Sequence, residues 1–461
     1  MKLAVVILAA GQGKRMKSDL PKVLQPLAGR PLLGHVVSRA RALNPSSIHV
    51  VYGHGGDAVR EALVKEKLQW ALQGEQLGTG HAVMQAMPNV ADDELVLVLY
   101  GDVPLIDAGT LRQLIAAAGA KAMSLLTVML DNPSGYGRIV RKSGAIQKIV
   151  EQKDATKAQL KIREGNSGIM AAPAKLLRKW LGKLGNRNAQ GEYYLTDIIA
   201  MAVKDKVKVT PLIAPTVAEV LGVNDKAQLA ELEAMHRAER ARELMVAGAT
   251  IIDPSRIDIR GDISVGRDVF LDANVLLEGK VTLGDRVRVG PNVVLRDVSI
   301  GSDCVIHPNS VLEQSVLGTG CSIGPYARVR PGSKLGANVH IGNFVELKKT
   351  EIADGSKANH LTYLGDAVIG KGVNVGAGTI TCNYNGYDKF ETVIEDGVFV
   401  GSDTQLVAPV RVGKRAVIGA GTTVVKDVPE GALALSRAEQ KNVEGYADKV
   451  EARYRDRAKA K

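Results

Sequence analysis

The residues best suited to chemistry in the first half of the chain gather in and after a glycine-rich segment, residues 8–16. The segment reads LAAGQGKRM, and Lys22 follows it closely. Gly11 and Gly13 allow the backbone to bend around a ligand and to expose N–H groups to phosphate oxygens. Arg15 and Lys22 add positive charge. The third glycine of a dinucleotide fingerprint and the GK[ST] of a P-loop are both missing, so the pattern indicates phosphate binding without defining the ligand.

A second candidate is Asp102, which ends the most apolar run of the first half, ELVLVLYGD (residues 94–102). Ligands of open α/β sheets bind beyond the carboxyl ends of the strands. A carboxylate at that edge, near a triphosphate, is suited to hold Mg²⁺. The alternative is that Asp102 is a helix N-cap, a position that Asp also favours.

In the second half, His360 stands in the segment ANHLTYLGD, inside an otherwise repetitive region. A lone histidine is more often structural than catalytic. Arg330, Lys348 and Tyr363 interrupt the same repeats with groups that could together grip a sugar phosphate. A histidine titrates near neutral pH and can take a proton from an amine nucleophile. These neighbours therefore favour a catalytic role for His360.

The first half of the chain predicts an α/β sheet that would position these groups. Residues 4–11, 47–53, 94–102 and 122–130 are apolar runs expected to form strands, and residues 31–43 have helical spacing. Strands alternating with helices favour a parallel sheet covered on both faces. The first run could pass for a signal peptide, but it lacks a small-x-small cleavage pattern, and we interpret it as a buried strand. Residues 225–247 contain no Gly or Pro and predict one long helix.

After Thr250 an aliphatic residue recurs at every sixth position. The series begins Val265, Leu271, Leu277, Leu283, Val289, Leu295, then slips by one residue to Ile300. A period of six predicts short strands separated by tight corners, with one aliphatic side chain per face pointing inward. Glycine often follows the aliphatic residue, as at Gly284 and Gly301, and we expect it there because corners need unusual dihedral angles. The polar segment 381–392 is expected to be a loop extruded from the coils, where binding residues often lie.

Composition limits the classes of function. Cys304, Cys321 and Cys382 have no paired spacing, so neither a disulfide framework nor a zinc site is indicated. The first two fall at repeat positions expected to be buried, and a covalent thiol mechanism at Cys382 is less favoured than direct transfer. No apolar run approaches the length of a membrane span. The net charge of +11 is scattered, which favours phosphorylated small substrates over nucleic acid. We expect a cytoplasmic enzyme with a frayed basic tail at residues 449–461.

Four motifs resemble those of the sugar-1-phosphate nucleotidyltransferases: the segment at 8–16 with its following PKVL, QGEQLGTGHA at 73–82, YGDVPL at 100–105 and GYGRI at 135–139. With the six-residue repeats, nearly the whole chain resembles the bacterial bifunctional enzymes that join an N-acetylglucosamine-1-phosphate uridylyltransferase to a glucosamine-1-phosphate acetyltransferase. The resemblance implies an α/β chain with a Rossmann-like nucleotidyltransferase domain (1–224), a linker helix (225–248) and a left-handed parallel β-helix acetyltransferase domain with a C-terminal tail (249–461). It also implies UTP and acetyl-CoA as co-substrates, Mg²⁺, and a homotrimer with acyl sites between subunits.

In the first domain the resemblance implies roles for particular residues. The nucleotide and its surroundings would contact Leu8, Ala9, Ala10, Gly11, Gln73, Gly78, Thr79, Tyr100 and Gly101. Arg15 and Lys22 would neutralise the leaving pyrophosphate, and Asp102 and Asn224 would hold Mg²⁺. The amino sugar would contact Gly137, Glu151 and Asn166. Lys14 stands where Thr or Ser is common; it could contact phosphate or lie in solvent, and we favour solvent.

In the second domain the resemblance implies that His360 is the general base for direct attack of the amine on the thioester. The sugar phosphate would be bound by Arg330, Lys348, Tyr363, Asn374 and Glu346. Acetyl-CoA would be bound by Ala377, Asn383, Tyr384, Ser402, Ala420 and Arg437. Asn359 stands where Gly usually precedes the histidine, and we expect little effect.

Two alternatives keep part of this interpretation. In one, the repeats form only a regulatory or assembly module; the polar set around His360 argues against it. In the other, the chain is a non-catalytic nucleotide-sensing subunit; intact Arg15, Lys22 and Asp102 argue against that.

Overall fold

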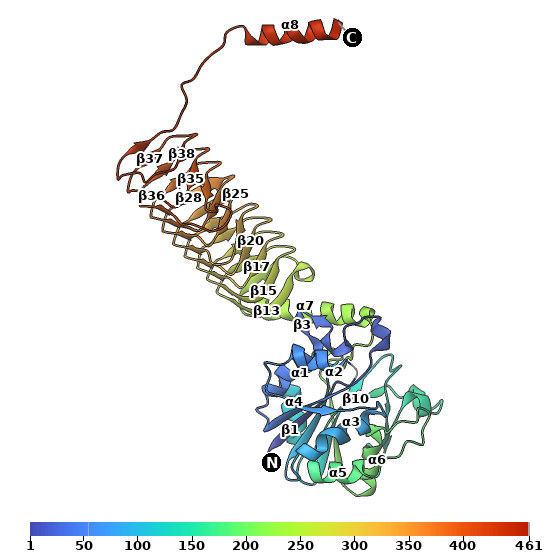
Figure 1. The fold of residues 1–461 in the computed structure, drawn as a ribbon. Coiled ribbons are helices and arrows are strands. Elements are labelled where there is room, and N and C mark those ends of the chain that lie inside the picture. Colours follow the sequence, from blue (N-terminus) through green and yellow to red (C-terminus); the bar gives the residue numbers. More distant parts are fainter. Residues whose placement is uncertain (54, 460–461) are drawn as a thin grey trace. The chain divides into compact units, whose positions relative to one another are not determined.

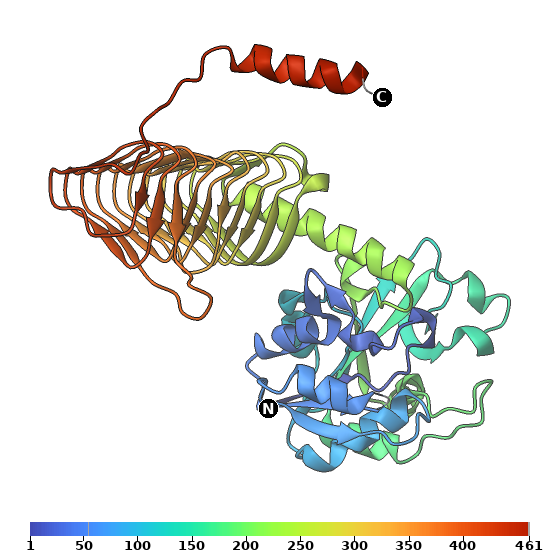
Figure 2. The same ribbon diagram turned by 45° about the horizontal axis from the view of Figure 1, so that its top comes forward.

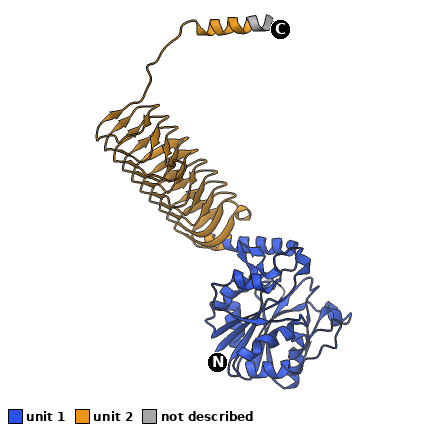
Figure 3. Ribbon diagram, in the orientation of Figure 1, with its two compact units in different colours: residues 1–240 blue, residues 241–461 orange. Residues whose placement is uncertain are grey.

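The computed structural model describes residues 1–53 and 55–459, except for the side chains of 456–459. Contacts divide the chain into two compact units, residues 1–240 and 241–461 (Figure 3). The division falls within helix α7 (Lys226–Val246), which confirms the long helix predicted there. Among the helices in the described part of the chain, none is long and apolar enough to cross a membrane.

The first unit is built on a sheet with strand order β11-β7-β10-β6-β1-β4-β5 (Figure 1). Its strands are β1 (Leu3–Leu8), β4 (Ser47–Tyr52), β5 (Gln69–Leu72), β6 (Leu95–Tyr100), β7 (Ala122–Met129), β10 (Glu164–Pro173) and β11 (Lys208–Ile213). The four predicted strands are confirmed. The predicted parallel pairing is confirmed for β1 with β4 and β6, but β10, which the sequence did not predict, runs antiparallel to both β6 and β7. The chain reaches β10 through a hairpin, β8 (Arg138–Lys142) and β9 (Ala145–Val150), and not through a crossover helix.

Helices cover both faces of this sheet, as predicted. Successive side chains of β1 are buried on opposite faces of the sheet. Val6 lies in the core with Ala82, Leu177 and Ile198 on one face, and Val5 lies in the core on the other face. The first core involves α3 (Thr79–Ala86), α5 (Ala174–Leu181) and α6 (Ile198–Lys204). The second involves α1 (Leu32–Arg41), α2 (Gly56–Ala62) and α4 (Ala108–Ala117). Burial on both faces explains why the central strands are apolar throughout and do not alternate.

The second unit is a solenoid of stacked coils, seen along its length in Figure 2. One coil consists of β16 (Arg288–Val289), β17 (Val294–Arg296) and β18 (Ser299–Ile300). In-register partners on successive coils are 18 residues apart at Leu277↔Leu295 and 17 apart at Val289↔Ile306. The six-residue period is therefore confirmed, and each slip in it is a corner that is one residue shorter. The aliphatic series forms one continuous core with the buried Cys304 and Cys321.

The predicted reason for the glycines after the aliphatic residues is wrong. Gly284 and Gly301 do not have positive φ angles; the left-handed residues lie two positions later, at Arg286 (φ 58°) and Asp303 (φ 62°). A Cβ on Gly284 would lie 2.6 Å from the amide nitrogen of Ser302 on the next coil. These glycines are required because successive coils approach too closely for a side chain.

Two further segments bear on the predictions. The extruded loop is confirmed between β32 (Ile380–Cys382) and β33 (Thr392–Ile394). The tail is not frayed: it forms helix α8 (Tyr446–Lys459). Within it, Glu451 and Arg455 form an (i, i+4) ion pair at 3.0 Å.

Candidate active sites

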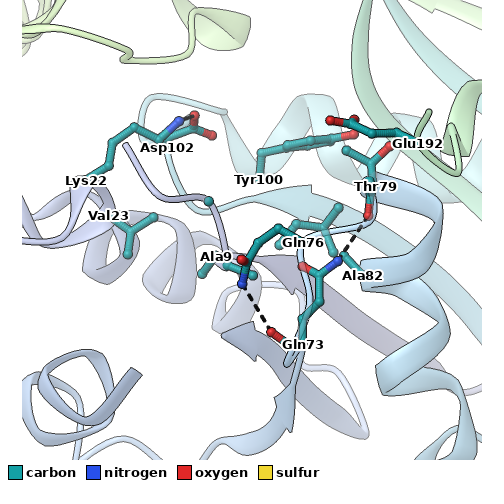
Figure 4. Close-up of a pocket in the computed structure, with 14 residues that line it drawn as sticks. Ala9, Lys22, Val23, Gln73, Gln76, Thr79, Ala82, Tyr100, Asp102 and Glu192 are labelled. Carbon is teal, nitrogen blue, oxygen red and sulfur yellow. Dashed lines mark hydrogen bonds and ion pairs between the residues drawn. The ribbon is translucent and has the colours of Figure 1, made fainter. Parts of the chain in front are cut away.

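The carboxyl ends of β1 and β6 lie side by side, with Leu8 paired to Tyr100. The loops that follow them diverge around a cavity of about 230 Å³. Figure 4 shows its polar lining, with Lys22 and Asp102 facing each other and Gln73 and Thr79 further along the wall. The predicted residues that line this cavity are Leu8, Ala9, Ala10, Gly11, Lys22, Gln73, Gly78, Thr79, Tyr100 and Asp102. Gly101 lies behind the lining, where its N–H donates to the Leu8 carbonyl at 2.9 Å.

Two glycines shape this cavity through close packing. Gly13 has a φ of 61°, and a Cβ on it would lie 2.6 Å from the Cβ of Lys22. Gly78 has a φ of 111° and precedes the first turn of α3, where a Cβ would lie 2.7 Å from the Tyr193 carbonyl oxygen. The buried Gln73 donates from its amide to the Gly78 carbonyl at 3.1 Å. The start of α3 and the fixed Gln73 amide therefore lie together in the lining of this cavity.

A second cavity of about 650 Å³ adjoins the first through shared residues Thr79, Tyr100 and Asp102. The predicted residues in its lining are Arg15, Gly137, Glu151, Asn166 and Asn224. Glu151 accepts a hydrogen bond from the Thr196 hydroxyl at 3.0 Å. Burial raises the pKa of Glu151, and three nearby carboxylates add to the effect. Asp102 therefore stands where the two cavities meet.

The four charged or polar residues at this junction are already paired. Lys22 forms an ion pair with Asp102, with 14% and 17% of the two side chains exposed. Arg15 donates to the Asn224 amide oxygen at 2.9 Å. The alternative that Asp102 is a helix N-cap is wrong, because α4 is capped by Asp107. Lys14 is exposed, as favoured, and lines neither cavity.

Helix α7 holds the segment that carries Arg15 and Lys22. A small core joins Met16 and Leu27 to Val223 and Leu232. A Glu233 carboxylate oxygen accepts from the Ala28 N–H at 2.9 Å. The start of α7 thus sets the position of the cationic segment as well as that of Asn224.

Sequence reasoning missed several lining residues of these cavities. Gln76 lies within a motif already quoted. Tyr136 likewise lies within the quoted GYGRI motif. Glu192 and Thr196 come from segments with no repeated or charged pattern, and only the fold brings them to the cavities.

In the solenoid, His360 heads a column of small residues on successive coils. It ends β28 (Lys357–His360). The Gly378 N–H points at the His360 carbonyl (3.4 Å), and the N–H of Asp403 donates to the Ala377 carbonyl at 2.7 Å. The N–H of Gly421 donates to the Ser402 carbonyl at 2.8 Å, which places Ala420 on the next coil. Arg437 ends the column by donating to the Ala420 carbonyl at 3.1 Å.

A break in a ladder of alternating charges marks the predicted sugar-phosphate residues. Arg296 pairs with Glu278 at 2.8 Å and with Glu313 at 3.0 Å on neighbouring coils. The next two positions, Arg330 and Lys348, are both cationic. The column therefore places two cations on adjacent coils with no acid between them, an arrangement that is able to attract an anion.

The two cations find their acids outside that column. Arg330 pairs with Glu346 at 2.9 Å, and Lys348 lies 3.4 Å from Asp366. Tyr363 is the in-register neighbour of Glu346. Asn383 also bonds Asp366, which fastens the extruded loop to this cluster.

The loop contributes one cation that the sequence did not reveal. The neighbouring Lys348 ammonium lowers the pKa of Lys389, so the two lysines face one another. Tyr384 is exposed on the same loop, and its hydroxyl donates to the Gly386 carbonyl at 2.6 Å. Asn374 begins β31 (Asn374–Val375), which pairs with β28. Burial raises the pKa of the Cys382 thiol, which disfavours the thiolate that covalent catalysis requires.

Family models match both halves of the chain. A MobA-like NTP transferase domain matches residues 5–247. A GMPPB C-terminal domain matches 259–341, and a bacterial transferase hexapeptide of six repeats matches 391–426. The chain is therefore a nucleotidyltransferase joined to a hexapeptide-repeat transferase.

Curated relatives match almost end to end. The Bifunctional protein GlmU of Azoarcus sp. (strain BH72) is 59% identical over 98% of this chain and 100% of its own length. Those of Aromatoleum aromaticum (58%, covering 96% and 98%) and Nitrosospira multiformis (56%, covering 96% and 97%) are similar. The chain belongs to the bifunctional GlmU family.

Membership confirms the resemblance and the activity it implied. The chain is a bifunctional enzyme of UDP-N-acetylglucosamine synthesis. It transfers acetyl from acetyl-CoA to glucosamine-1-phosphate, then uridylyl from UTP to N-acetylglucosamine-1-phosphate with release of pyrophosphate. The alternatives of a purely regulatory solenoid and of a nucleotide-sensing subunit are set aside.

Proposed function

We propose that residues 1–224 carry out uridylyl transfer where the two cavities meet, and that residues 249–461 carry out acetyl transfer along the His360 column. The observation that supports the first assignment best is the junction at Asp102, where Lys22, Arg15 and Asn224 gather between two adjoining cavities. UTP would bind against residues 8–11 and Gln73. The amino sugar would bind against Glu151 and Asn166.

The residues at this junction fit Mg²⁺. Asp102 offers a carboxylate and Asn224 an amide oxygen, the oxygen ligands that Mg²⁺ prefers, and Mg²⁺ commonly takes only one or two carboxylates together with substrate phosphates. The Lys22 ammonium on Asp102 shows that this carboxylate already attracts a cation. When bound, Mg²⁺ would neutralise charge on the phosphates.

Uridylyl transfer needs no protein nucleophile. A phosphate oxygen of N-acetylglucosamine-1-phosphate attacks the α-phosphorus of UTP, a new P–O bond forms, and the bond to pyrophosphate breaks. Arg15 and Lys22 stabilise the negative charge that accumulates on the leaving pyrophosphate. Lys22 must leave Asp102 to do so, because the ion pair holds its ammonium in the free enzyme. Positioning and charge neutralisation supply the rate.

Acetyl transfer uses the column of small residues. Acetyl-CoA would lie along Ala377, Ser402 and Ala420, with a CoA phosphate at Arg437 and the thioester at His360. Arg330, Lys348, Tyr363 and Lys389 would hold the sugar phosphate. His360 takes a proton from the amine as nitrogen attacks the thioester carbonyl, and the CoA thiolate leaves.

A second and third copy of the chain would complete this site. The corner column that begins with hydrogen-bonded asparagines, Asn274 and Asn292, changes to Tyr326, Phe344 and Leu361. These three are 52–65% exposed at positive φ, an unfavourable backbone state for bulky residues, and two of their rings stack at 5.3 Å. An apolar ridge beside His360 supports a homotrimer with shared acyl sites. We also propose a cytoplasmic location, where UTP and acetyl-CoA are supplied.

A coupled assay tests both assignments on one protein. The wild-type chain receives Mg²⁺, UTP, acetyl-CoA and glucosamine-1-phosphate, and the release of CoA thiol and of pyrophosphate is followed together. His360→Ala should lower thiol release by about 10²-fold or more, the contribution of a general base. The same variant should release pyrophosphate at the wild-type rate when N-acetylglucosamine-1-phosphate is supplied. Full thiol release by His360→Ala would contradict the assignment.

A further inference from the structure

Asn343 is the polar side chain that faces the imidazole of His360. It ends β25 (His340–Asn343), and its Cα is the in-register partner of His360 on the next coil. Its amide oxygen lies 3.1 Å from His360 Nδ1. We propose that Asn343 is a positioning residue for acetyl transfer, which holds the proton of His360 on Nδ1 and so leaves the lone pair of Nε2 free for the substrate amine. This inference rests on the proposed role of His360 as the base.

The chemistry of the two side chains supports this assignment. A neutral imidazole carries its proton on one nitrogen and a lone pair on the other. An amide oxygen can only accept, so it selects the tautomer with the proton on Nδ1. In this tautomer the lone pair lies on Nε2, where the substrate amine can meet it. Without the contact, the two tautomers compete, and the ring can rotate away from the substrate.

Asn343 differs from the other asparagines of the solenoid. Asn274, Asn292 and Asn309 sit at left-handed corners and bond one another in a ladder. Asn343 is not at a positive φ angle, and its side chain bonds His360 instead of a neighbouring asparagine. A corner role therefore does not account for it.

The backbone of His360 is fixed without the side chain of Asn343. The Thr362 hydroxyl donates to the His360 carbonyl at 2.6 Å. The side chain is exposed, so a partner is needed to fix the ring itself. The titratable groups on β28 and the strands paired with it are His340 on β25 and Lys357 on β28; β31 has none. No carboxylate on these described strands holds the imidazole, which leaves the amide of Asn343 to do so.

Two substitutions of Asn343 separate positioning from folding. Asn343→Leu removes the acceptor at similar volume, whereas Asn343→Asp keeps an acceptor and adds a negative charge. His340→Leu, on the same strand and outside the site, is the matched control. For each full-length variant, kcat and both KM values for acetyl transfer are measured from about pH 5.5 to 9, with uridylyl transfer as an internal reference.

We expect kcat of Asn343→Leu to fall about 5- to 10-fold with unchanged KM values, the effect of one hydrogen bond. Asn343→Asp should recover most of kcat at high pH. Its acid limb should move to higher pH by about one unit, because a carboxylate raises the pKa of an adjacent imidazole. His340→Leu should match the wild type.

The outcomes separate this inference from the assignment of the base. If His360→Ala loses acetyl transfer but both Asn343 variants keep the wild-type kcat and pH profile, Asn343 does not position the ring. The same holds if Asn343→Asp loses as much kcat as Asn343→Leu at every pH. If His360→Ala remains fully active, the proposed base and this inference both fall.

Discussion

Asp102→Asn should separate the two roles that the structure gives to one carboxylate, partner of Lys22 and candidate ligand of Mg²⁺. The substitution keeps the shape but leaves the Lys22 ammonium without a counter-charge, in a site where 14% and 17% of the two side chains are exposed. At 4 Å, a pair near a protein surface gains roughly 4 kcal/mol of Coulomb energy, most of which desolvation offsets. A net loss of about 2 kcal/mol in the free energy of unfolding follows for a charged hydrogen bond.

That loss corresponds to a fall of about 4–8 °C in the melting temperature of the first unit, given its size. Uridylyl transfer should fall by about 10²–10³-fold or more, the usual effect of removing one stabilising group from a charged transition state. Acetyl transfer should remain at the wild-type rate, because the residues proposed for it all belong to the second unit. Calorimetry measures the first effect, and the releases of pyrophosphate and CoA thiol measure the other two.

A double variant decides between structure and catalysis. Lys22→Met with Asp102→Asn removes both charges, so most of the lost stability should return while uridylyl transfer stays low. Recovery of uridylyl transfer in the double variant would contradict the roles proposed for both Asp102 and Lys22. Equal loss of both activities in Asp102→Asn would refute the assignment of two separate sites.

Three further outcomes are expected. Burial raises the pKa of Glu151, so its ionised form weakens folding at neutral pH. Glu151→Gln should therefore raise the melting temperature of the first unit at pH 7.5, and this gain should shrink as the pH falls through the raised pKa. The same substitution should raise KM for the sugar phosphate. Burial lowers the pKa of His236 to about 4, so stability that is present above pH 6.5 is lost as the pH falls toward 4. His236→Phe keeps the edge contact with His35 at 5.7 Å and should flatten the pH dependence of the melting temperature. An unchanged pH dependence would contradict the assignment of this effect to His236. Cys382→Ser should retain acetyl transfer within about twofold, since partial burial raises the pKa of the Cys382 thiol and disfavours the thiolate. A loss near that of His360→Ala would favour a covalent step instead.

The sequence predicted those parts of the fold that depend on local periodicity. One aliphatic residue in six predicts a coil, because each inward face needs one, and the apolar runs predict the central strands. It could not reveal that β10 is antiparallel, since a strand buried on both faces has the same composition in either direction. It also gave the wrong reason for glycines such as Gly284, because both a close approach between coils and a positive φ angle require glycine, and the sequence cannot distinguish the two causes.

The sites divide in a similar way. Arg15, Lys22 and Asp102 follow strands and carry charge, so they can be found from the sequence. Lys389 and Asn343 are brought to the acetyl site by a loop and by a 17-residue stacking relation, and nothing in their immediate sequence marks them.

In the His360 column, the distance between two residues of the proposed acetyl site depends on the number of coils between them. Each coil pairs only with its neighbours, so the solenoid can gain or lose whole coils without repacking its core. An added coil of 17 or 18 residues before Arg330 would leave every proposed acetyl-site residue at its present spacing. The same coil placed between Ala377 and Ala420 would move Arg437 away from His360 by one strand spacing, about 4.8 Å. If acetyl-CoA lies along this column as proposed, the number of coils before Arg330 can change without affecting the site, whereas the number between Ala377 and Ala420 must match the length of the cofactor.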